Sequence, residues 1–402
     1  MRFPMKIVER LLEGVFKMSS SITSIVILLI IIFLFKEGFG LFRSPVVENG
    51  YGLYINSKNP IADINPTQIK QIFDGEIDNW KTIGGNEESI YLFRFDEIFS
   101  IYTDEELGEN YQFLPQKLNN IIAENSNIIA FFPKKYMQEI SSNTKEIATK
   151  NIEITDFVLG KEWLPTTTPS PLFGIVPLVL GTLLVSFLAI LIALPLGLGV
   201  AIYLSEIASN RVRGIIRPAI ELLAGIPSVV YGFFGLVIIV PIVQKVGNIS
   251  AGETAFTGSL ILAIMALPTI ISISEDAIRN TPLALRESSY ALGATQWQTI
   301  YKIVIPYASS GISAAIILGI GRAIGETMAV LMVTGNGAVI PHSIFESVRT
   351  IPATIAAELG EAPIGGTHYQ ALFLLGCVLF LFTLILSIVS ELISKKQTSK
   401  TA

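Results

Sequence analysis

The chain has 402 residues, of which 51% are hydrophobic and only 15% are charged, and its mean hydropathy is +0.58. This composition is too apolar for a water-soluble enzyme of this length, so it predicts an α-helical integral membrane protein. The formal net charge of -5 does not decide topology, because orientation depends on where Lys and Arg lie beside the spans. The single cysteine, Cys377, excludes a disulfide within the chain.

Six segments have the roughly 20 mostly apolar residues that a membrane-spanning helix needs. The first follows four basic residues between positions 2 and 17 and ends in FKEGFGLFRS, without a small-residue cleavage site. We therefore expect an uncleaved signal anchor rather than a signal peptide. The six predicted spans are approximately 22–42, 172–204, 219–243, 255–273, 308–334 and 371–393.

Basic residues are concentrated on one side of these spans. If the amino terminus is cytoplasmic, six crossings return the carboxyl terminus to the cytoplasm. The cytoplasmic segments then hold Arg211, Arg213, Arg217, Arg279, Arg286, Lys302, Lys395, Lys396 and Lys400, and the external segments near the spans hold only Lys36, Arg43, Lys245 and Arg349. The positive-inside rule therefore predicts that both termini are cytoplasmic.

The region 46–169 departs from the apolar pattern. It is rich in Asp, Glu, Asn and Lys, contains strand-like runs such as YGLYIN and SIYLFRF, and ends in the linker-like PTTTPSP. We expect a small extracytoplasmic α/β domain here, whose acidic residues form a solvated surface. The predicted organisation is a cytoplasmic amino terminus with the first span (1–45), this domain (46–169) and a transmembrane domain (170–402).

The segment 281–306 is polar and helix-prone although it lies between two spans. A Thr-Pro start, a break at Gly293 and Pro306 near the end predict two short helices at the membrane surface. Simple connections between helices are usually only a few residues long. Tyr290, Leu292, Trp297 and Tyr301 would be exposed to water unless a partner covered them, so the segment is predicted to be a docking surface.

The run ESSYALGATQWQTIYKIVIP resembles the EAA loop of ABC importer permeases, the loop that contacts the ATPase. The positions that match the loop's pattern are Glu287, Ser288, Ser289, Gly293, Ile303 and Pro306, with serines in place of the two alanines and Ile305 in place of a leucine. The chain has no G-x-x-x-x-G-K-[ST] phosphate-binding loop. The resemblance therefore implies that ATP is bound and hydrolysed by a partner ATPase dimer, and that this chain is not an enzyme.

Two further runs, ELLAGIPSVVYGFFGL and GRAIGETMAVLMVTGN, resemble the PstC-type permease subunits of bacterial phosphate importers. The resemblance implies a type I ABC importer permease fold, a heterodimer with a PstA-type subunit, and phosphate translocation by alternating access. The residues alone leave open a permease for sulfate or molybdate, or a membrane sensor whose external domain detects a ligand. Nothing in the sequence predicts nucleic-acid binding, a cofactor or a metal site, and His342 and His368 have no ligand cluster around them.

Arg322 and Glu326 lie inside the fifth predicted span, where each charge costs about 2.5 to 3.5 kcal/mol on insertion scales. At a spacing of four residues they would share a helix face and could pair as a structural unit. Intramembrane ionisable residues usually mark a transport pathway, and the PstC-type resemblance implies that this pair lies in it. Gly225, Gly232, Gly319, Gly321 and Gly325 are interpreted as packing positions.

The run from Asn59 to Gly85, NPIADINPTQIKQIFDGEIDNWKTIGG, resembles a segment of phosphate-binding proteins. Those receptors hold phosphate with an Arg followed by Ser-Gly-Thr, whereas here Arg94 is followed by FDEIFSIY, and Asp96 and Glu97 would repel an anion. We therefore expect a single lobe that does not bind phosphate, and a separate extracytoplasmic receptor that does.

Overall fold

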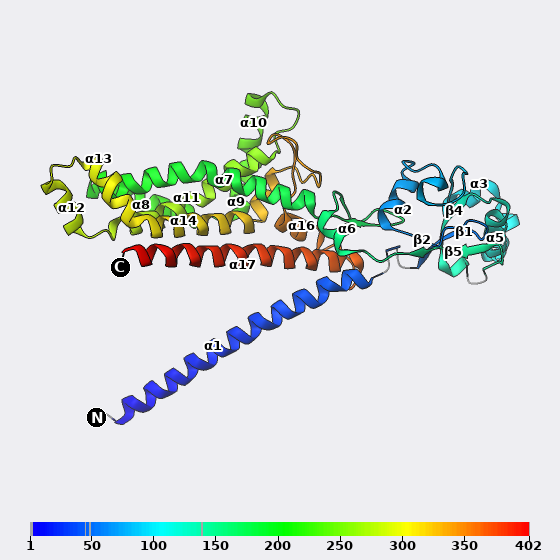
Figure 1. The fold of residues 1–402 in the computed structure, drawn as a ribbon, viewed down its shortest axis with the longest axis horizontal. Helices are drawn as coiled ribbons and strands as arrows, with labels where there is room; N and C mark the ends of the chain where they lie inside the picture. Colours follow the sequence, from blue (N-terminus) through cyan, green and yellow to red (C-terminus); the bar gives the residue numbers. More distant parts are fainter. Residues whose placement is uncertain (1–2, 45, 48–49, 138–139, 402) are drawn as a thin grey trace. The chain divides into compact units, whose positions relative to one another are not determined.

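The computed structural model describes residues 3–44, 46–47, 50–137 and 140–401 (Figure 1). The chain forms two compact units. The first comprises Met1–Gly174 with Pro363–Leu374, and the second comprises Ile175–Ala362 with Leu375–Ala402. The predicted boundary after residue 45 falls on a position outside the described residues.

Among the described residues, six helical segments are long and apolar enough to cross a membrane, which confirms the predicted number of spans. They are Leu12–Arg43, Val176–Ile207, Ser228–Gly247, Ala255–Arg279, Gln296–Gly325 and Thr367–Val389. The chain is therefore an α-helical membrane protein in which one stretch, between the first two spans, folds as a separate α/β region.

The predicted third span, 219–243, is wrong at its beginning. Helix α8 (Asn210–Ala224) ends before Gly225, and α9 (Ser228–Phe234) begins after Pro227. The interruption coincides with Pro227, because proline lacks an amide hydrogen and disfavours the helical conformation in the residue before it. The spanning helix starts at Ser228 and continues through a π-helical segment, Gly235–Ile239, into α10 (Val240–Gly247).

The predicted fifth span, 308–334, is likewise not one helix. Helix α14 (Ile305–Gly325) ends at Gly325, Glu326 has an extended backbone with φ -71° and ψ 132°, and α15 (Met328–Val333) follows. At its other end the helical path extends back to Gln296, because α13 (Gln296–Thr299) continues through the π-helical segment Ile300–Val304 into α14. Pro306 lies in the first turn of α14, directly after this π-helical segment.

The α/β region of the first unit is built on a mixed four-stranded sheet in the order β3-β4-β1-β5. β4 runs parallel to β3 and antiparallel to β1, which is also antiparallel to β5. The strands of the region are β1 (Tyr51–Asn56), β2 (Asp63–Ile64), β3 (Tyr91–Arg94), β4 (Ile128–Pro133), β5 (Thr144–Glu146), β6 (Ala148–Thr149), β7 (Trp163–Leu164) and β8 (Leu172–Phe173). The strands expected in YGLYIN and SIYLFRF are confirmed as β1 and β3.

Short helices complete this region and cover one core. Its buried side chains include Tyr54, Phe93, Leu118 and Phe132. The helices are α2 (Pro66–Phe73), α3 (Ile98–Ile101), α4 (Asp104–Leu107), α5 (Leu114–Glu124) and α6 (Ile154–Leu159). Asn65 caps α2 through its side chain, and Gln68 reaches back to the amide of Asn65, so a capping box fixes where α2 begins.

The first unit also contains the long helix α1 (Phe3–Gly38) and the beginning of α17 (Thr367–Thr401). A Cβ at Gly38 would come within 2.9 Å of the backbone nitrogen of Leu374, so only glycine allows this approach. Phe33 and Phe373 stack edge to face with ring centroids 5.5 Å apart. Further along α17, beyond the part assigned to the first unit, lies Cys377, whose side chain is buried.

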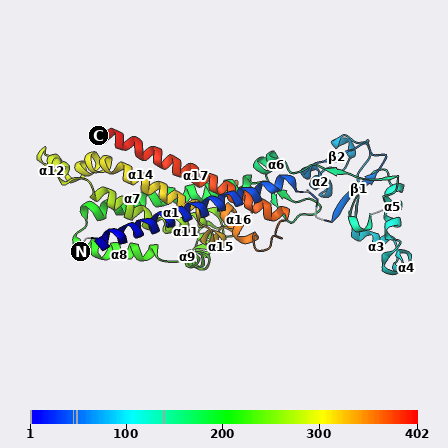
Figure 2. The same ribbon diagram turned by 90° about the horizontal axis from the view of Figure 1, so that it is seen from below.

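The second unit is organised around α7 (Val176–Ile202), α11 (Ala255–Arg279) and α14, which pack side by side (Figures 1 and 2). Small and branched apolar side chains, among them Ala189, Ala266 and Ala323, fill the space between them. α7 ends in a π-helical segment, Tyr203–Ile207. α12 (Leu283–Ala291) and α13 lie at one end of this bundle, and α16 (Ile351–Glu358) belongs to the same unit (Figure 1).

Candidate functional site

The segment 281–306 forms one separate short helix, α12, as its sequence predicts, whereas the expected second short helix, α13, is the beginning of the fifth candidate span, Gln296–Gly325. α12 ends in a Schellman motif, in which the amides of Gly293 and Ala294 donate to the carbonyls of Tyr290 and Ser289 at 2.9 and 3.2 Å. Gly293 has φ +83°, a conformation that glycine adopts without steric cost. The glycine of the EAA-type pattern is therefore the residue that lets the chain turn from α12 towards α13.

The second helix has its own start signal. The hydroxyl of Thr295 accepts from the amide of Gln298, and the side chain of Gln298 accepts from the amide of Thr295, which together form a capping box. Ser289 of α12 and Thr299 of α13 are buried, and their hydroxyl oxygens lie 2.9 Å apart. This bond joins the two helices, so α12 and α13 form one structural element, which we call the coupling segment (residues 281–306).

The outer face of the coupling segment is apolar and uncovered. Leu292, Trp297 and Tyr301 are 89%, 66% and 73% exposed. Glu287 and Ser288 are also exposed on α12, whereas Ile303 is half-buried. Of the six residues predicted for ATPase coupling, only Ser289 is buried. The geometry is that of a surface able to enter a groove in another protein.

Three hydrogen bonds that the sequence did not predict tie the coupling segment to the bundle. Arg286 donates to Glu206 Oε1 at 2.8 Å and to the Ile278 carbonyl at 2.9 Å. Gln296 donates to the carbonyl of Glu206 at 2.9 Å. The only signal in the sequence was an isolated Glu206 at the end of a long apolar run.

Arg322 and Glu326 do not form the helical pair that their spacing suggested. Because α14 ends at Gly325, Glu326 leaves the helix, and its Oε1 accepts from the amide of Ala329 at 3.4 Å. Among the described residues no ion pair joins the two side chains. Arg322 Nη1 instead donates to the Thr269 hydroxyl of α11 at 3.2 Å.

The glycines near these residues are of two kinds. A Cβ at Gly232 would lie 2.8 Å from Met332 Sδ, and one at Gly319 would lie 3.1 Å from Ile270 Cγ1, so both are packing positions as predicted. Gly321 and Gly325 differ, because a Cβ at either would meet no other group of this chain within 4 Å, so the packing interpretation stays a prediction there. No other part of this chain therefore packs against α14 at these two positions.

The α/β region places Arg94 at the end of β3. Its Nη2 donates to the Phe73 carbonyl at 3.5 Å, and its guanidinium lies 6.0 Å from the centre of the Phe73 ring. Asp96 and Glu97 follow in a short 3₁₀ helix. The guanidinium is thus engaged with Phe73, and carboxylates come directly after the strand.

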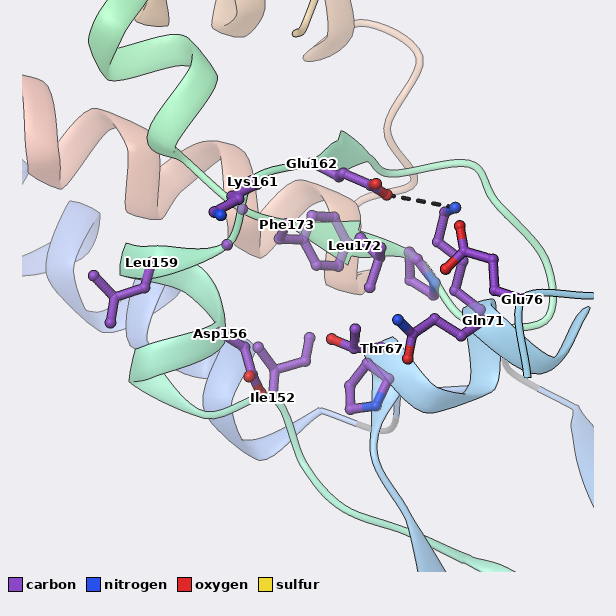
Figure 3. Close-up of a pocket in the computed structure, with 15 residues that line it drawn as sticks. Thr67, Gln71, Glu76, Ile152, Asp156, Leu159, Lys161, Glu162, Leu172 and Phe173 are labelled. Atoms are coloured by element: carbon purple, nitrogen blue, oxygen red, sulfur yellow. Dashed lines mark ion pairs between the residues drawn. The ribbon is translucent and has the colours of Figure 1, made fainter. Parts of the chain in front are cut away.

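A cavity of about 270 Å³ in the same unit was not predicted (Figure 3). It lies between α2, α6 and the strands β7 and β8. Thr67 and Gln71 line it together with Leu172 and Phe173, and Glu162 reaches towards Lys70, with 3.5 Å between the charged atoms. The hydrogen bond to Asp74 raises the pKa of Lys70, so this amine stays protonated. No group of His, Cys, Asp or Glu able to hold a metal ion occurs within the described ranges.

A chain with six candidate spans, an exposed coupling segment at one end of its core bundle and an arginine within a span has the construction of a membrane transport subunit. A family model described as "Binding-protein-dependent transport system inner membrane component" matches residues 193–399. The chain belongs to this family of ABC importer permeases, and it is a multi-pass inner membrane protein rather than an enzyme. The fold expected from the resemblance is thereby confirmed.

Relatives of known name point the same way. The chain is 42% identical over 240 residues to a "Probable ABC transporter permease protein", YqgH of Bacillus subtilis, covering 59% of this chain and 77% of that protein. It is 38% identical over 267 residues to the phosphate transport system permease protein PstC of Pasteurella multocida, covering 61% of this chain and 82% of that protein. These matches confirm the PstC-type resemblance.

Among solved structures, an ABC-type phosphate transport receptor from Vibrio cholerae is 18% identical and aligns with 28% of this chain and 51% of its own, with a TM-score of 0.20.

Proposed function

We propose that the chain is the permease subunit of an ATP-driven phosphate importer and forms its translocation pathway by alternating access. Relatives that carry the name phosphate transport system permease protein PstC support this substrate. In this proposal the chain pairs with a PstA-type subunit, docks a dimer of ATP-binding subunits and receives phosphate from an extracytoplasmic binding protein. Membrane lipid surrounds the spans, both termini are cytoplasmic, and residues 46–169 lie outside.

The observation that carries this proposal is that Arg322 has no ion-pair partner among the described residues. Its side chain lies on a spanning helix, and within the described part of the chain it makes no ion pair, only the hydrogen bond to Thr269. A cation inside a membrane must face protein, water or an anion. A half-buried guanidinium without an ion-pair partner in the described part of the chain supplies fixed positive charge and several donors to a passing oxyanion.

Glu326 has a different role in this proposal. Its carboxylate is held at the start of α15 by the Ala329 amide and not by Arg322. It therefore leaves the charge of Arg322 available, and it can accept a proton from phosphate as the anion passes. The break between α14 and α15 places it where the helix path changes direction.

The test measures uptake of radioactive phosphate and ATP hydrolysis together, in liposomes that hold the complete complex. Arg322→Ala should reduce uptake at least about tenfold, since one charge-assisted hydrogen bond to a partner is worth about 1.5 to 3 kcal/mol. Arg322→Lys should retain more uptake than Arg322→Ala. The exposed Arg211 provides the matched control, and Arg211→Ala should transport normally.

The double variant Arg322→Ala with Glu326→Ala separates a pathway residue from a structural one. A structural pair would regain uptake when both charges are removed, whereas a pathway arginine would not. Recovery of uptake in the double variant would contradict the proposed pathway. If sulfate or molybdate inhibited the uptake of radioactive phosphate more strongly than unlabelled phosphate does, the preferred substrate would be that oxyanion and not phosphate.

The coupling segment is proposed to dock the ATPase through Glu287, Ser288, Ser289, Gly293, Ile303 and Pro306. Its apolar outer face, with Leu292 and Trp297 exposed, supports this role. Leu292→Glu should weaken copurification of the ATPase, because a buried, unpaired carboxylate opposes the contact. Equal recovery of the ATPase with this variant would contradict the docking assignment.

A further inference from the structure

The end of α7 is a junction at which several segments of the second unit meet. Its last turn, Tyr203–Ile207, is π-helical, a geometry that often marks functional sites in helices. The carbonyls of this turn accept side-chain donors: Arg213 donates to those of Leu204 and Ser205, and Gln296 to that of Glu206. The orphan carbonyls of a helix end are thus satisfied by residues of α8 and α13.

Glu206 is the one residue in this turn that contacts both helices of the coupling segment. Its carboxylate accepts from Arg286 of α12 at 2.8 Å, and its carbonyl accepts from Gln296 of α13 at 2.9 Å. The side chains of Glu206 and Arg286 are only 8% and 18% exposed. Coulombic attraction is stronger in such a setting than at an open surface, so the ion pair is a stiff connection.

Arg286 extends the connection to a second helix of the bundle. The same Nη2 that contacts Glu206 also donates to the carbonyl of Ile278, in the last turn of α11. α12 is therefore fastened to the ends of α7 and α11, the two helices that form the bundle core with α14. A movement of α12 would be transmitted to both helices.

The contact between Glu206 and Arg286 differs in one respect from an ion pair that only maintains the fold. The Nε of Arg286 is buried and has no hydrogen-bond partner. Nearly all buried donors in native proteins are paired, and an unpaired one carries a cost. A second arrangement of Arg286, in which its Nε donates to an acceptor, would remove that cost when the coupling segment moves.

We propose that Glu206 is a positioning residue for energy coupling: it holds both helices of the coupling segment and transmits their movement to α7. This inference rests on the proposed function, because it takes the coupling segment to be the ATPase contact. Glu206 does not touch phosphate or ATP. Its effect must therefore appear in the phosphate moved per ATP hydrolysed, and not in the assembly of the complex.

The experiment uses the complete complex in liposomes and measures phosphate uptake and ATP hydrolysis in the same preparation. Glu206→Gln keeps the size of the side chain and the backbone bond to Gln296 but removes the charge that pairs with Arg286. The expected result is a drop of about tenfold in phosphate moved per ATP, the change that a loss of about 1.4 kcal/mol of coupling gives. The ATPase should still copurify in its normal ratio, and Glu206→Asp should recover part of the coupling.

Two further variants test the geometry. Arg286→Gln should lower coupling at least as far as Glu206→Gln does, because it also removes the bond to the Ile278 carbonyl, and the double variant should be no worse than Arg286→Gln alone. Gln296→Leu should have a smaller effect, since it removes only the bond to the carbonyl. Glu358→Gln is the matched control, because Glu358 belongs to an ion pair of similar burial with Arg349 that does not contact the coupling segment.

The outcomes are distinct. Unchanged phosphate per ATP in Glu206→Gln, with the ATPase bound, would overturn the inference. Loss of the ATPase from the variant complex would also overturn it, since Glu206 would then only maintain the fold of the coupling segment. A wild-type complex that hydrolyses ATP without moving phosphate would contradict the proposed function itself, independently of Glu206.

Discussion

At Gly293 the chain turns with φ +83°, and a Cβ there would meet no neighbouring group within 4 Å. Any cost of substitution must therefore come from the backbone conformation and not from crowding within the chain. We expect Gly293→Ala to destabilise the turn by about 1 kcal/mol, and Gly293→Asn by less, because asparagine tolerates the left-handed region better. Phosphate per ATP in the reconstituted complex should fall in the order Gly, Asn, Ala.

Gly214 is the control for this series. It lies exposed inside α8, has no neighbour within 4 Å of its Cβ position and has no positive φ. Gly214→Ala should leave coupling unchanged and raise helix stability slightly, by up to about 1 kcal/mol. Equal effects of alanine at the two positions would contradict the backbone explanation for Gly293.

The two serines that replace the alanines of the EAA pattern occupy different environments. Ser288 is exposed and donates to the Ala284 carbonyl of its own helix, whereas Ser289 is buried against Thr299. Ser289→Ala removes the bond between α12 and α13 and should cost about 1 kcal/mol of unfolding free energy. Ser288→Ala should be neutral or slightly stabilising, because alanine favours helix. Thermal unfolding of the detergent-solubilised protein would compare them, and identical midpoints would exclude a role for the Ser289 bond.

The spanning helices show which features a hydropathy pattern can predict. The number of spans and the approximate position of each followed from apolar composition alone. The breaks at Pro227 and Glu326 did not, because the residues on both sides remain apolar and a window average does not register one non-helical residue. Pro227 was a visible signal, whereas nothing in the residues around Glu326 indicated its extended conformation.

The central strand of the α/β region gives a prediction of pH dependence. Tyr54 on β1 is 1% exposed, and burial together with the nearby charge of Glu146 raises its pKa to about 12. In the unfolded chain the phenol has a pKa of about 10. The folded region therefore keeps the proton between these values while the unfolded chain loses it, so this contribution to stability is complete below about pH 10 and is lost as the pH rises towards 12.

Urea unfolding followed by the fluorescence of the buried Trp80 and Trp163 would measure this effect in the full chain. The free energy of unfolding should fall between pH 10 and pH 12. Tyr54→Phe keeps the ring in the core and removes the ionisable group, so its stability should fall less over that interval. If the unfolding free energy fell equally with pH in Tyr54→Phe and in the unsubstituted protein, other groups would control alkaline unfolding.

At the scale of the whole chain, the proposed function assigns receptor support to residues 46–169 outside the membrane and ATPase docking to the coupling segment on the cytoplasmic side. Replacing residues 46–169 by a short Gly/Ser bridge should lower uptake that depends on the separate binding protein, because the region is proposed to support that protein. Copurification of the ATPase should remain normal, since the coupling segment belongs to the other unit. Loss of the ATPase would show that the two functions are not separable, and unaltered uptake would leave the external region without this role.

The contacts between residues far apart in the chain could not be predicted from the sequence. Arg286 and Glu206 are 80 positions apart, and Arg322 and Thr269 are 53 apart. A charge pattern predicts partners three or four residues away, which is why Arg322 was expected to pair with Glu326. The residues of the coupling segment and Arg322 could be selected from spacing and composition, but their actual partners depend on the packing of α7, α11 and α14.

The single thiol of the chain has a practical consequence. Cys377 is 2% exposed, and a buried thiol reacts poorly with alkylating reagents. A cysteine introduced at the exposed position 292 or 301 would therefore take a maleimide fluorophore or spin label selectively, without prior removal of the native cysteine. Protection of such a cysteine from labelling by the bound ATPase would report that the partner covers the coupling segment, in a protein that otherwise keeps its natural sequence.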